Sequence, residues 1–484
     1  MGGRPPAWLP GDARDGAPVG GLGGAMVVLA ACGSDPVSGG ETVLVCPSGA
    51  TIARELPASE VARVVSAGGY RTVLTVDPSA PRAADARFRR ITDALAAARA
   101  IRATEAGKPG CRITILVAAG IFVGSTSATA DTTREQLPLR LDFPNVTLQG
   151  RYEIPLDTAG RPRGPAAANV GTTLVASPAL TIIGGTTQTG VSEPLVIVNS
   201  EQGVGGHNVT IEGFIMRSGH DATSTTGGGK GVLALRVTQL VLRGLSFEGN
   251  FTERVDLRAG SALVERNFST GLGETCDICI AGPGQFVVRS NTLDQGGIPG
   301  VLVVPATQLP VPNGVSQYEL PAEATVDVEI VSNEIRHHQR TPVGTAIRVA
   351  TVGINAPNVV GTTVASVRDN WVHDNRFGFI IEAGFPVAGS ALRGDAIITT
   401  RGNRFSASCQ RDLLVSLSRH TTGLGLANAP YLRNSRYLLD LGVDVPWGAA
   451  WFANPDGLGN SLVVNGATIP NGRLTAYDAS RTCP

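Results

Sequence analysis

The 484-residue chain has almost no lysine, few aromatic residues and no long apolar segment. Only Lys108 and Lys230 are lysines among 40 basic residues, which balance 40 acidic residues to a formal net charge of zero. Because no basic block is present, the sequence predicts no binding to nucleic acid. Aromatic residues make up 5% of the chain, which disfavours an extended groove lined with aromatic rings.

The apolar run near the N-terminus, Gly23 to Ala31, is too short to cross a bilayer. It ends in Leu-Ala-Ala before Cys32 and resembles a bacterial lipobox, in which small residues precede a cysteine that is lipidated after cleavage. Residues 1–32 are therefore predicted to be an export signal, with the mature protein attached to the cell envelope by lipid at Cys32. The alternative is a chance Ala-Ala-Cys in an alanine-rich chain.

Six cysteines remain once Cys32 is set aside, an even number that suits disulfide pairing in an exported protein. The pairs that we consider are Cys46–Cys111, Cys276–Cys279 and Cys409–Cys483. Cys276 and Cys279 form a CxxC motif, but no second CxxC or nearby histidine completes a zinc site. A structural disulfide or two free thiols are the alternatives for that motif.

One short phrase recurs seven times between residues 209 and 405: β-forming residues, two mostly polar residues, then asparagine or an apolar counterpart. The copies are Val209–Phe214, Leu240–Leu245, Leu263–Asn267, Val287–Asn291, Val328–Asn333, Val364–Asn370 and Ile398–Asn403. Their ends lie 22 to 42 residues apart, a range typical of repeat architectures. We therefore predict an all-β solenoid with insertions in its loops. A sandwich or a propeller is the alternative, although hairpin and four-strand spacings are missing.

The last five copies end in the same asparagine. Asparagine tolerates the left-handed backbone region and bonds to neighbouring backbone groups. In stacked coils, each side-chain amide can also bond to the next one along the stack. The sequence therefore predicts a ladder of asparagine side chains along one turn of the solenoid.

A single convincing helix is expected from Phe88 to Ala103, where apolar residues lie close to helical spacing. A strand-like segment, 112–123, and a Val-Thr-Leu-Gln-Gly phrase, 146–150, follow it. With the asparagine turns, this block resembles the right-handed parallel β-helix, or pectate-lyase-like, superfamily over roughly residues 88–405, and it is similar to β-helix-repeat bacterial lipoproteins of unknown function. The resemblance implies that the helix caps the open end of the coil. Superfamily members include polysaccharide lyases, glycoside hydrolases, epimerases and adhesins.

The resulting organisation has four parts: 1–32 as export signal, 33–85 as linker and N-terminal strands, 86–434 as parallel β-helix, and 435–484 as C-terminal cap. Insertions interrupt the coils at 125–136, 152–170, 218–231 and 305–323, and such insertions often wall a cleft on one face.

Aligning the coils on their asparagine brings polar residues to two common offsets. They are Asp294, Arg336 and His373 at three residues past the asparagine, and Gln295, His337 and Asp374 at four, with His338 following. Because neighbouring strands lie about 4.8 Å apart, these groups should share one face and reach one another. Four of them are candidate catalytic residues for acid–base chemistry on a sugar, namely Asp294, His337, His373 and Asp374. The same groups suit a divalent metal, and the alternative is a row of solvated turn residues.

A second group of acidic residues offers the oxygen ligands that calcium needs. Its members are Glu253, Asp256, Glu265, Glu274 and Asp277. Calcium is the cofactor that these residues would suit, and a solvated surface is the alternative. Neither the calcium ligands and arginine base of the β-helix lyases nor the paired aspartates of the β-helix hydrolases map onto this chain.

Three functions follow as hypotheses. We favour an exported surface protein that binds a polysaccharide or cell-surface glycan without strong catalysis. A polysaccharide lyase or glycoside hydrolase, and a structural or adhesive envelope protein, are the alternatives. The chain is expected to be a monomer that meets the membrane only through its lipid.

Overall fold

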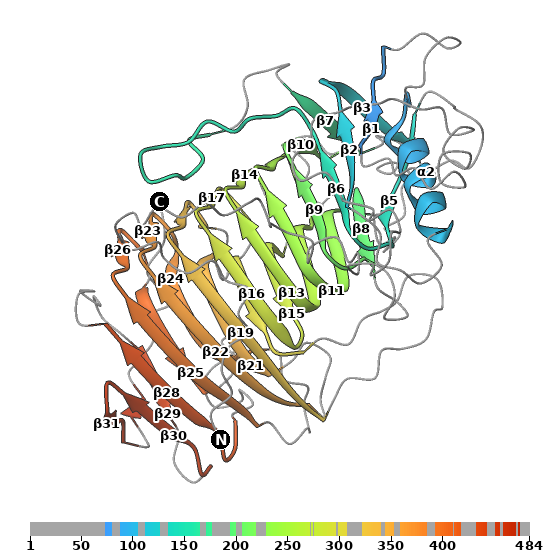
Figure 1. Ribbon diagram of the computed structural model, residues 1–484. Helices are drawn as coiled ribbons and strands as arrows, with labels where there is room; N and C mark the ends of the chain where they lie inside the picture. The colour runs from blue at the N-terminus through green and yellow to red at the C-terminus, as the bar shows by residue number, and fades with distance from the viewer. Residues whose placement is uncertain are drawn as a thin grey trace, which may run out of the picture.

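In the computed structural model, successive strands wind around a coil and pair in parallel with their equivalents one turn later (Figure 1). The structure describes residues 73–79, 88–104, 112–125, 134–164, 171–176, 194–199, 206–218, 229–271, 273, 275–296, 299–306, 322–339, 344–352, 359–384, 393–409, 411–417, 432–442, 451–454, 458–470 and 473–474. Cys32 and the remaining N-terminal signal residues lie outside these ranges.

The strands form three stacks. The first stack contains β5 (Leu139–Leu141), β8 (Val196–Asn199), the first halves of β11 (Lys230–Arg243) and β13 (Glu253–Glu265), β15 (Cys276–Ala281), β18 (Pro299–Val304), β21 (Thr345–Val352), β24 (Phe377–Gly384), β27 (Arg411–Ser416) and β29 (Trp451–Asn454). The second stack contains β1 (Val73–Val76), β2 (Ile113–Val117), β6 (Val146–Gln149), β9 (Val209–Glu212), the second halves of β11 and β13, β16 (Gly284–Arg289), β19 (Glu323–Val331), β22 (Val360–Arg368), β25 (Gly394–Arg401), β28 (Arg436–Leu441) and β30 (Ser461–Val464). The third stack contains β4 (Glu135–Gln136), β3 (Gly120–Ser125), β7 (Thr172–Val175), β10 (Phe214–Arg217), β12 (Ser246–Glu248), β14 (Phe268–Thr270), β17 (Thr292–Asp294), β20 (Glu334–Arg336), β23 (Trp371–His373) and β26 (Arg404–Ser406).

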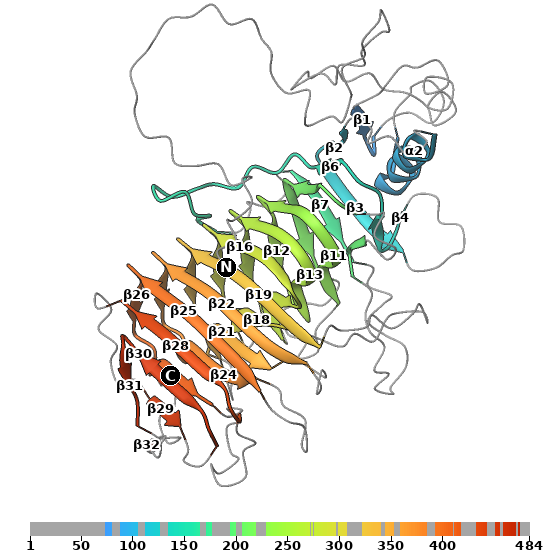
Figure 2. The same cartoon turned by 60° about the horizontal axis from the view of Figure 1, so that its bottom comes forward.

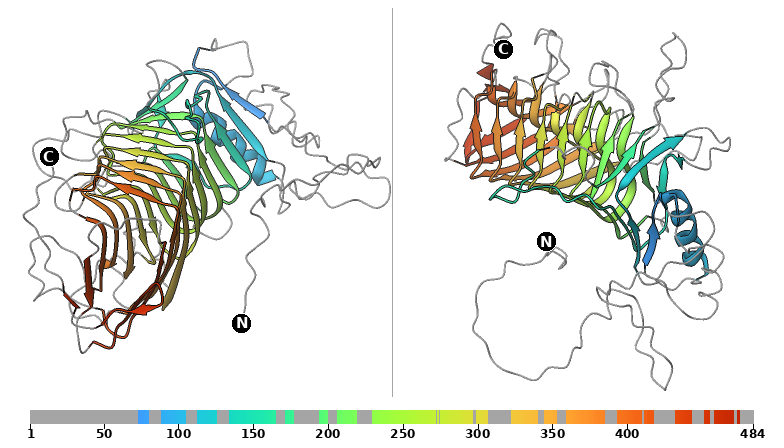
Figure 3. Two further views of the ribbon diagram at one scale, coloured as in Figure 1. Left: turned by 90° about the vertical axis from the view of Figure 1, so that its left-hand side faces the viewer. Right: turned by 90° about the horizontal axis from the view of Figure 1, so that it is seen from above.

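The three stacks surround a common interior, as the view along the coil shows (Figure 3, left). Two short strands, β31 (Ala467–Thr468) and β32 (Arg473–Leu474), pair antiparallel with β30 and β29 at the C-terminal end. The predicted right-handed parallel β-helix solenoid is confirmed. The division into four parts stays a prediction.

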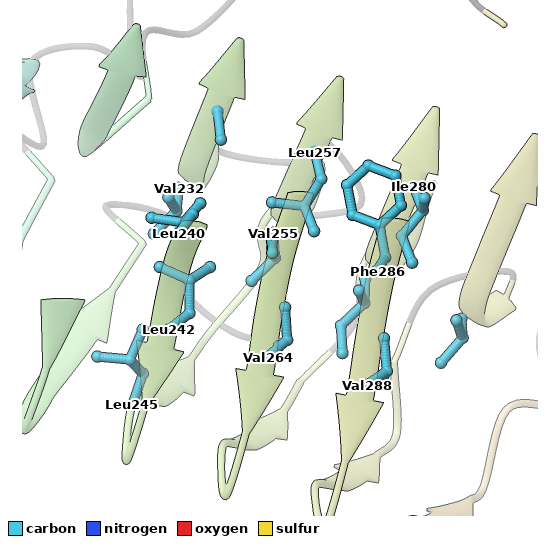
Figure 4. Packing of buried hydrophobic residues seen from close by; sticks show 14 of the residues in the cluster. Val232, Leu240, Leu242, Leu245, Val255, Leu257, Val264, Ile280, Phe286 and Val288 are labelled. Carbon is cyan, nitrogen blue, oxygen red and sulfur yellow. The ribbon is translucent and has the colours of Figure 1, made fainter. Parts of the chain in front are cut away.

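Alternating residues of the strands point inward, and apolar side chains fill the interior. In β22, for example, every second residue is buried. Inward residues of one coil lie against those of the next, such as Val264 beside Val288 and Leu242 beside Val264 (Figure 4). Each fully buried aliphatic side chain contributes about 1.5–3 kcal/mol, so these stacked rows supply the main driving force for winding the coil.

The predicted N-terminal helix is confirmed as α2 (Ile91–Thr104), which starts three residues later than expected and lies at the N-terminal end of the coil (Figure 1). The buried carboxylate of Glu135 accepts hydrogen bonds from the backbone N–H groups of Ile91 and Thr92, at 2.7 and 2.9 Å, and from the Thr92 hydroxyl at 2.7 Å. These N–H groups have no partner within the helix, so a residue far along the chain caps it. In the described part of the chain, no helix has the length and apolarity that a membrane crossing requires.

The asparagine ladder is confirmed. The Nδ2 group of Asn291 donates to Oδ1 of Asn333, and Nδ2 of Asn333 donates to Oδ1 of Asn370, each at 2.9 Å. Each Oδ1 also accepts the backbone N–H of the preceding asparagine, at 3.0 and 2.9 Å, and all five side chains are buried. The left-handed backbone, however, belongs to the residue before the asparagine, as at Ser290 and Ser332 with φ of 54° and 56°. The asparagine itself turns its amide inward, where only another amide or a carbonyl can satisfy it.

Cys276 and Cys279 are joined by a disulfide at the start of β15. Cys409 is also disulfide-bonded. The other candidates, Cys46, Cys111 and Cys483, lie outside the described residues, so the wider pairing scheme stays a prediction.

Replacing Asn333 with alanine removes the middle of the ladder and leaves buried donors and acceptors on both neighbouring coils unsatisfied. We expect a loss of about 1–3 kcal/mol in the free energy of unfolding, measured as a lower urea midpoint by circular dichroism. Ser366→Ala, a half-exposed change in the second stack, is the matched control and should change the midpoint little. Equal midpoints for the two variants would contradict a stabilising role for the ladder.

Candidate functional site

The outward face of the third stack carries a row of polar side chains. Each late strand of this stack has three residues, and the middle one, such as Ile335 or Val372, is buried in the interior. The first and third residues therefore face outward. We call the row of third residues the polar ladder. Its members are Arg217, Glu248, Thr270, Asp294, Arg336, His373 and Ser406, all partly exposed.

The residues that follow the polar ladder form a second left-handed turn. Gln295, His337 and Asp374 have φ angles of 53°, 58° and 54°, a region in which asparagine, aspartate and histidine are enriched. His337 and Asp374 are exposed over 41% and 46% of their side chains. The residue three positions past the asparagine is thus the outward-facing last residue of a strand, and the residue four positions past it lies in the turn that follows.

The structure brings the four candidate catalytic residues together. Nδ1 of His337 lies 2.7 Å from Oδ1 of Asp294, and Nδ1 of His373 lies 2.6 Å from Oδ2 of Asp374. The two imidazole rings lie on adjacent coils with centroids 6.3 Å apart. Their arrangement agrees with the register deduced from the sequence, whereas their catalytic role stays a prediction.

Arg336 links this group into one network. Its guanidinium donates to Oδ2 of Asp294 at 3.0 Å and to Oε1 of Glu334 at 2.6 Å. Nε2 of His373 lies 3.4 Å from the same Glu334 oxygen. Glu334 is buried and joins two coils of the ladder.

Glu334 and Trp371 were missed by the sequence analysis. Both occupy the first position of their strands, one residue past the asparagine. The indole of Trp371 stacks on His373 at 4.2 Å between centroids and 25° between planes. The alternation of side chains along a strand would have found both, because the residues one and three positions past the asparagine face the same side.

His338 does not belong to this face. Its imidazole is fully buried in the interior, with Nε2 3.8 Å from the carboxylate of Asp277. Gly296 makes room for it, since a Cβ there would lie 2.4 Å from the imidazole carbon. The backbone turns inward immediately after the left-handed residue His337, which separates the two adjacent histidines.

Residues 151–164 form an arm between β6 and β7 that runs along the third stack (Figure 2). At its base, the N–H of Arg151 donates to the Thr172 hydroxyl at 2.8 Å. Farther out, the Thr292 hydroxyl donates to the carbonyl of Pro162 at 2.6 Å. The arm therefore covers the first position of β17, where Thr292 is buried. The described part of the predicted 152–170 insertion thus lies beside the polar ladder.

The outer part of the arm reaches the network of charged residues. Arg161 pairs with Asp157 of the same arm at 2.9 Å. Its guanidinium carbon lies 5.5 Å from the ring centroid of Trp371, and that of Arg404 lies 5.7 Å from the same ring. Cation–π contacts of this kind contribute about 0.5–1 kcal/mol at exposed sites. The repeat pattern could not predict this contact, because Arg161 belongs to the arm and not to a repeated coil.

The charges around His373 and Glu334 shift their pKa values in opposite directions. Burial would lower the pKa of His373, but hydrogen bonds to Glu334 and Asp374 and the charges of both carboxylates outweigh it and raise the pKa. Burial would raise the pKa of Glu334, but the hydrogen bond from His373 and the charges of Arg336 and Arg161 lower it. The network therefore favours an imidazolium next to a carboxylate.

The five acidic residues considered for calcium do not share one face. Asp277 pairs with Arg254 in the interior, whereas Glu265 lies between Arg243 and Arg289 on the second stack. A separate cluster near Lys230 holds the Glu253 and Asp256 carboxylates, and Glu274 lies outside the described residues. Among the described residues, no three histidine, cysteine, aspartate or glutamate side chains are placed to hold one metal ion.

No family model matches the chain, and no curated protein matches it. Among solved structures, it is similar to the A-module of the mannuronan C-5 epimerase AlgE6 of Azotobacter vinelandii, with 14% identity, a TM-score of 0.39 and coverage of 76% of this chain and 88% of that one. It is also similar to DFA-IIIase from Arthrobacter chlorophenolicus A6 in complex with GF2, with 10% identity, a TM-score of 0.39 and coverage of 83% and 99%. A third is the tailspike protein of E. coli bacteriophage HK620 in complex with a pentasaccharide, with 13% identity, a TM-score of 0.39 and coverage of 85% and 67%. At these identities and TM-scores the likenesses carry no argument about activity, and the fold assignment rests on the strand pairing of the chain itself.

The raised pKa of His373 predicts a pH-dependent contribution to stability. A base with a raised pKa stabilises the folded state fully below its ordinary pKa of about 6.5, and this contribution disappears as pH rises through the folded value. His373→Gln should therefore lower the urea midpoint most at acid pH, and the difference from the wild type should shrink as pH rises above 6.5. An NMR titration of the imidazole should give a midpoint above the ordinary value. A difference that grows with pH would refute the assignment.

Proposed function

We propose that this protein binds a saccharide chain along the polar ladder. The observation that carries the proposal is the row of seven outward polar side chains on successive coils. Their spacing is that of neighbouring strands, about 4.8 Å, which is close to the length of one hexose unit in an extended chain. Each sugar unit would thus meet a new set of hydrogen-bonding groups at each coil.

The residues beside the ladder suit such a ligand. Both donors and acceptors lie along it, with Arg217 bonded to Glu248 at 2.8 Å and Arg336 bonded to Asp294. Sugar hydroxyl groups both donate and accept hydrogen bonds, so they match a surface of mixed sign.

Binding suits the ladder network better than catalysis does. Both nitrogens of His373 already face carboxylates, and its raised pKa makes it a poor base near neutral pH. Glu334 has a lowered pKa and makes a poor acid there. A polysaccharide lyase or hydrolase working at Asp294, His337, His373 and Asp374 therefore remains the second candidate.

Binding is tested with the purified protein from residue 33 onward against polygalacturonate, alginate, hyaluronan and dextran, by isothermal titration calorimetry. We expect binding to at least one of them, and His373→Ala should weaken it about tenfold, which corresponds to about 1.4 kcal/mol. Arg401→Ala is the matched control, because Arg401 pairs with Asp440 on the second stack and should leave the affinity unchanged. Equal losses in both variants would place the ligand elsewhere, and no binding to any member of the panel would count against this function.

We also propose that the protein is exported and attached to the membrane by lipid at Cys32. The support is the Leu-Ala-Ala-Cys sequence after a short apolar run. Expressed at full length in a bacterium, the wild type should enter the detergent phase of a Triton X-114 partition, and Cys32→Ala should stay in the aqueous phase. A wild-type protein found only in the aqueous phase would exclude the anchor.

A further inference from the structure

Three arginines are buried in the described part of the chain, and one of them lacks a counterion there. Arg254, Arg348 and Arg376 are exposed over only 1%, 5% and 8% of their surfaces. Arg254 is paired with Asp277, and Arg348 is paired with Glu382. The side chain of Arg376 makes no hydrogen bond or ion pair with any described residue, and its Nε is enclosed without a partner. Two of the three buried guanidinium groups are therefore neutralised by a carboxylate, and the third is not.

The charge of Arg376 cannot be removed by loss of a proton. A guanidinium stays protonated in proteins, whereas a buried lysine or histidine can become neutral. A charge taken out of water without a partner is strongly disfavoured. Arginines that only fill space with their stem keep the charged end in water, but the Nε of Arg376 is enclosed. The site therefore calls for an anion from outside the described residues.

The carboxylates close to Arg376 along the chain have other surroundings. Oδ2 of Asp374, two residues earlier, lies 2.6 Å from Nδ1 of His373. Burial raises the pKa of Asp412, which lies on the next coil, and no arginine of the described part of the chain lowers it again. A guanidinium within a few ångströms would lower that pKa. Neither carboxylate therefore balances Arg376.

Arg376 lies at the corner where the third stack turns into the first (Figure 1). The strand β23 ends at His373, and β24 begins at Phe377. The backbone N–H of Arg376 donates to the carbonyl of His338 on the preceding coil at 2.9 Å. This bond fixes the backbone from which the side chain extends, and 8% of the residue still reaches solvent. A ligand would approach along that exposed side.

Gln339 occupies the equivalent position on the preceding coil. It lies six residues past Asn333, as Arg376 lies six residues past Asn370, and neighbouring coils stack about 4.8 Å apart. Nε2 of Gln339 donates to the carbonyl of Asp374 at 2.9 Å, which holds its amide at the same corner. A primary amide has a second N–H to donate.

We propose that this corner binds an oxyanion whose charge balances the guanidinium of Arg376. Sulfate, phosphate and carboxylate groups present pairs of oxygens that match the planar fork of a guanidinium, and Gln339 supplies a further donor. The oxyanion is either a free ion or a substituent of a saccharide. The inference goes beyond the proposed saccharide binding and does not depend on it, because no member of the polar ladder takes part in the site.

The test measures binding of sodium sulfate and sodium phosphate to the purified full-length protein by isothermal titration calorimetry. Sodium chloride keeps the ionic strength constant, since a single chloride cannot bridge the fork. We expect one saturable site in the wild type, and Arg376→Gln should weaken it at least about tenfold. Arg401→Gln, which removes an exposed guanidinium paired with Asp440, is the matched control and should bind as the wild type does.

Stability gives a second readout that a packing role would not produce. Sulfate at about ten times its dissociation constant should lower the equilibrium constant for unfolding of the wild type about tenfold, measured by urea denaturation. Arg376→Gln should not show this saturable stabilisation, whereas Arg401→Gln should. A side chain that merely fills space would give the same response to sulfate in all three proteins.

Dextran and dextran sulfate, which share one backbone, distinguish the two sources of the oxyanion. A preference for dextran sulfate that disappears in Arg376→Gln and persists in Arg401→Gln would assign the oxyanion to the saccharide. Binding of free sulfate at Arg376 without such a preference would assign it to a free ion. Either result supports the site, and failure of unsulfated dextran to bind would count only against the polar ladder.

A wild type without a saturable response to sulfate or phosphate would overturn the inference, as would an Arg376→Gln variant that binds them with wild-type affinity. If Arg376→Gln does not fold, Arg376→Lys replaces it, because lysine keeps the charge and loses the fork. That variant should bind sulfate more weakly than the wild type, and equal affinity would refute the site.

Discussion

The buried asparagine ladder is the interaction on which the register of the coils depends. An amide in the interior has no water to bond, and leaving it unsatisfied costs about 1–3 kcal/mol. Within the ladder, a side-chain amide donates both to the amide oxygen of the next coil and to a backbone carbonyl, as Asn333 does to Asn370 and to Val288, each at 2.9 Å. A shift of one residue would break all of these bonds and would turn every outward side chain inward. The coils can therefore stack in only one register.

Because that register is fixed, the chemistry of the surface follows from position within the coil. Residues one and three past the asparagine face outward and residue two faces inward, so Glu334 and Arg336 share a face while Ile335 fills the core. Stacking then brings residues from distant parts of the chain to within bonding distance. Asp294 and Arg336 are 42 positions apart and lie 3.0 Å from each other.

The two charged clusters show how similar residues acquire different properties. In the ladder network, Glu334 is close to an arginine and an imidazolium, and its pKa is lowered. In the cluster near Lys230, burial raises the pKa of Glu253, and this carboxylate shares the lysine with Asp256. Burial raises the pKa of both groups, but only at Glu334 do the hydrogen bond from His373 and the charges of Arg336 and Arg161 outweigh it.

The sequence by itself determined the class of fold, the position of the capping helix and the stacking of Asp294 with His337, because the repeat phrase carries the register in its asparagine. It did not reveal the role of the residue directly after each asparagine, such as Glu334 or Trp371, since the alignment followed only the positions three and four residues past the asparagine. It placed His338 with its neighbours on the surface, whereas the turn sends that side chain inward toward Asp277. The contact of Arg161 with Trp371, and the separation of Glu253 from Glu265, were decided only by the tertiary structure. The repeat determines which positions of successive coils lie next to one another. The path of an insertion and the charges around each carboxylate depend instead on packing between segments that share no sequence pattern.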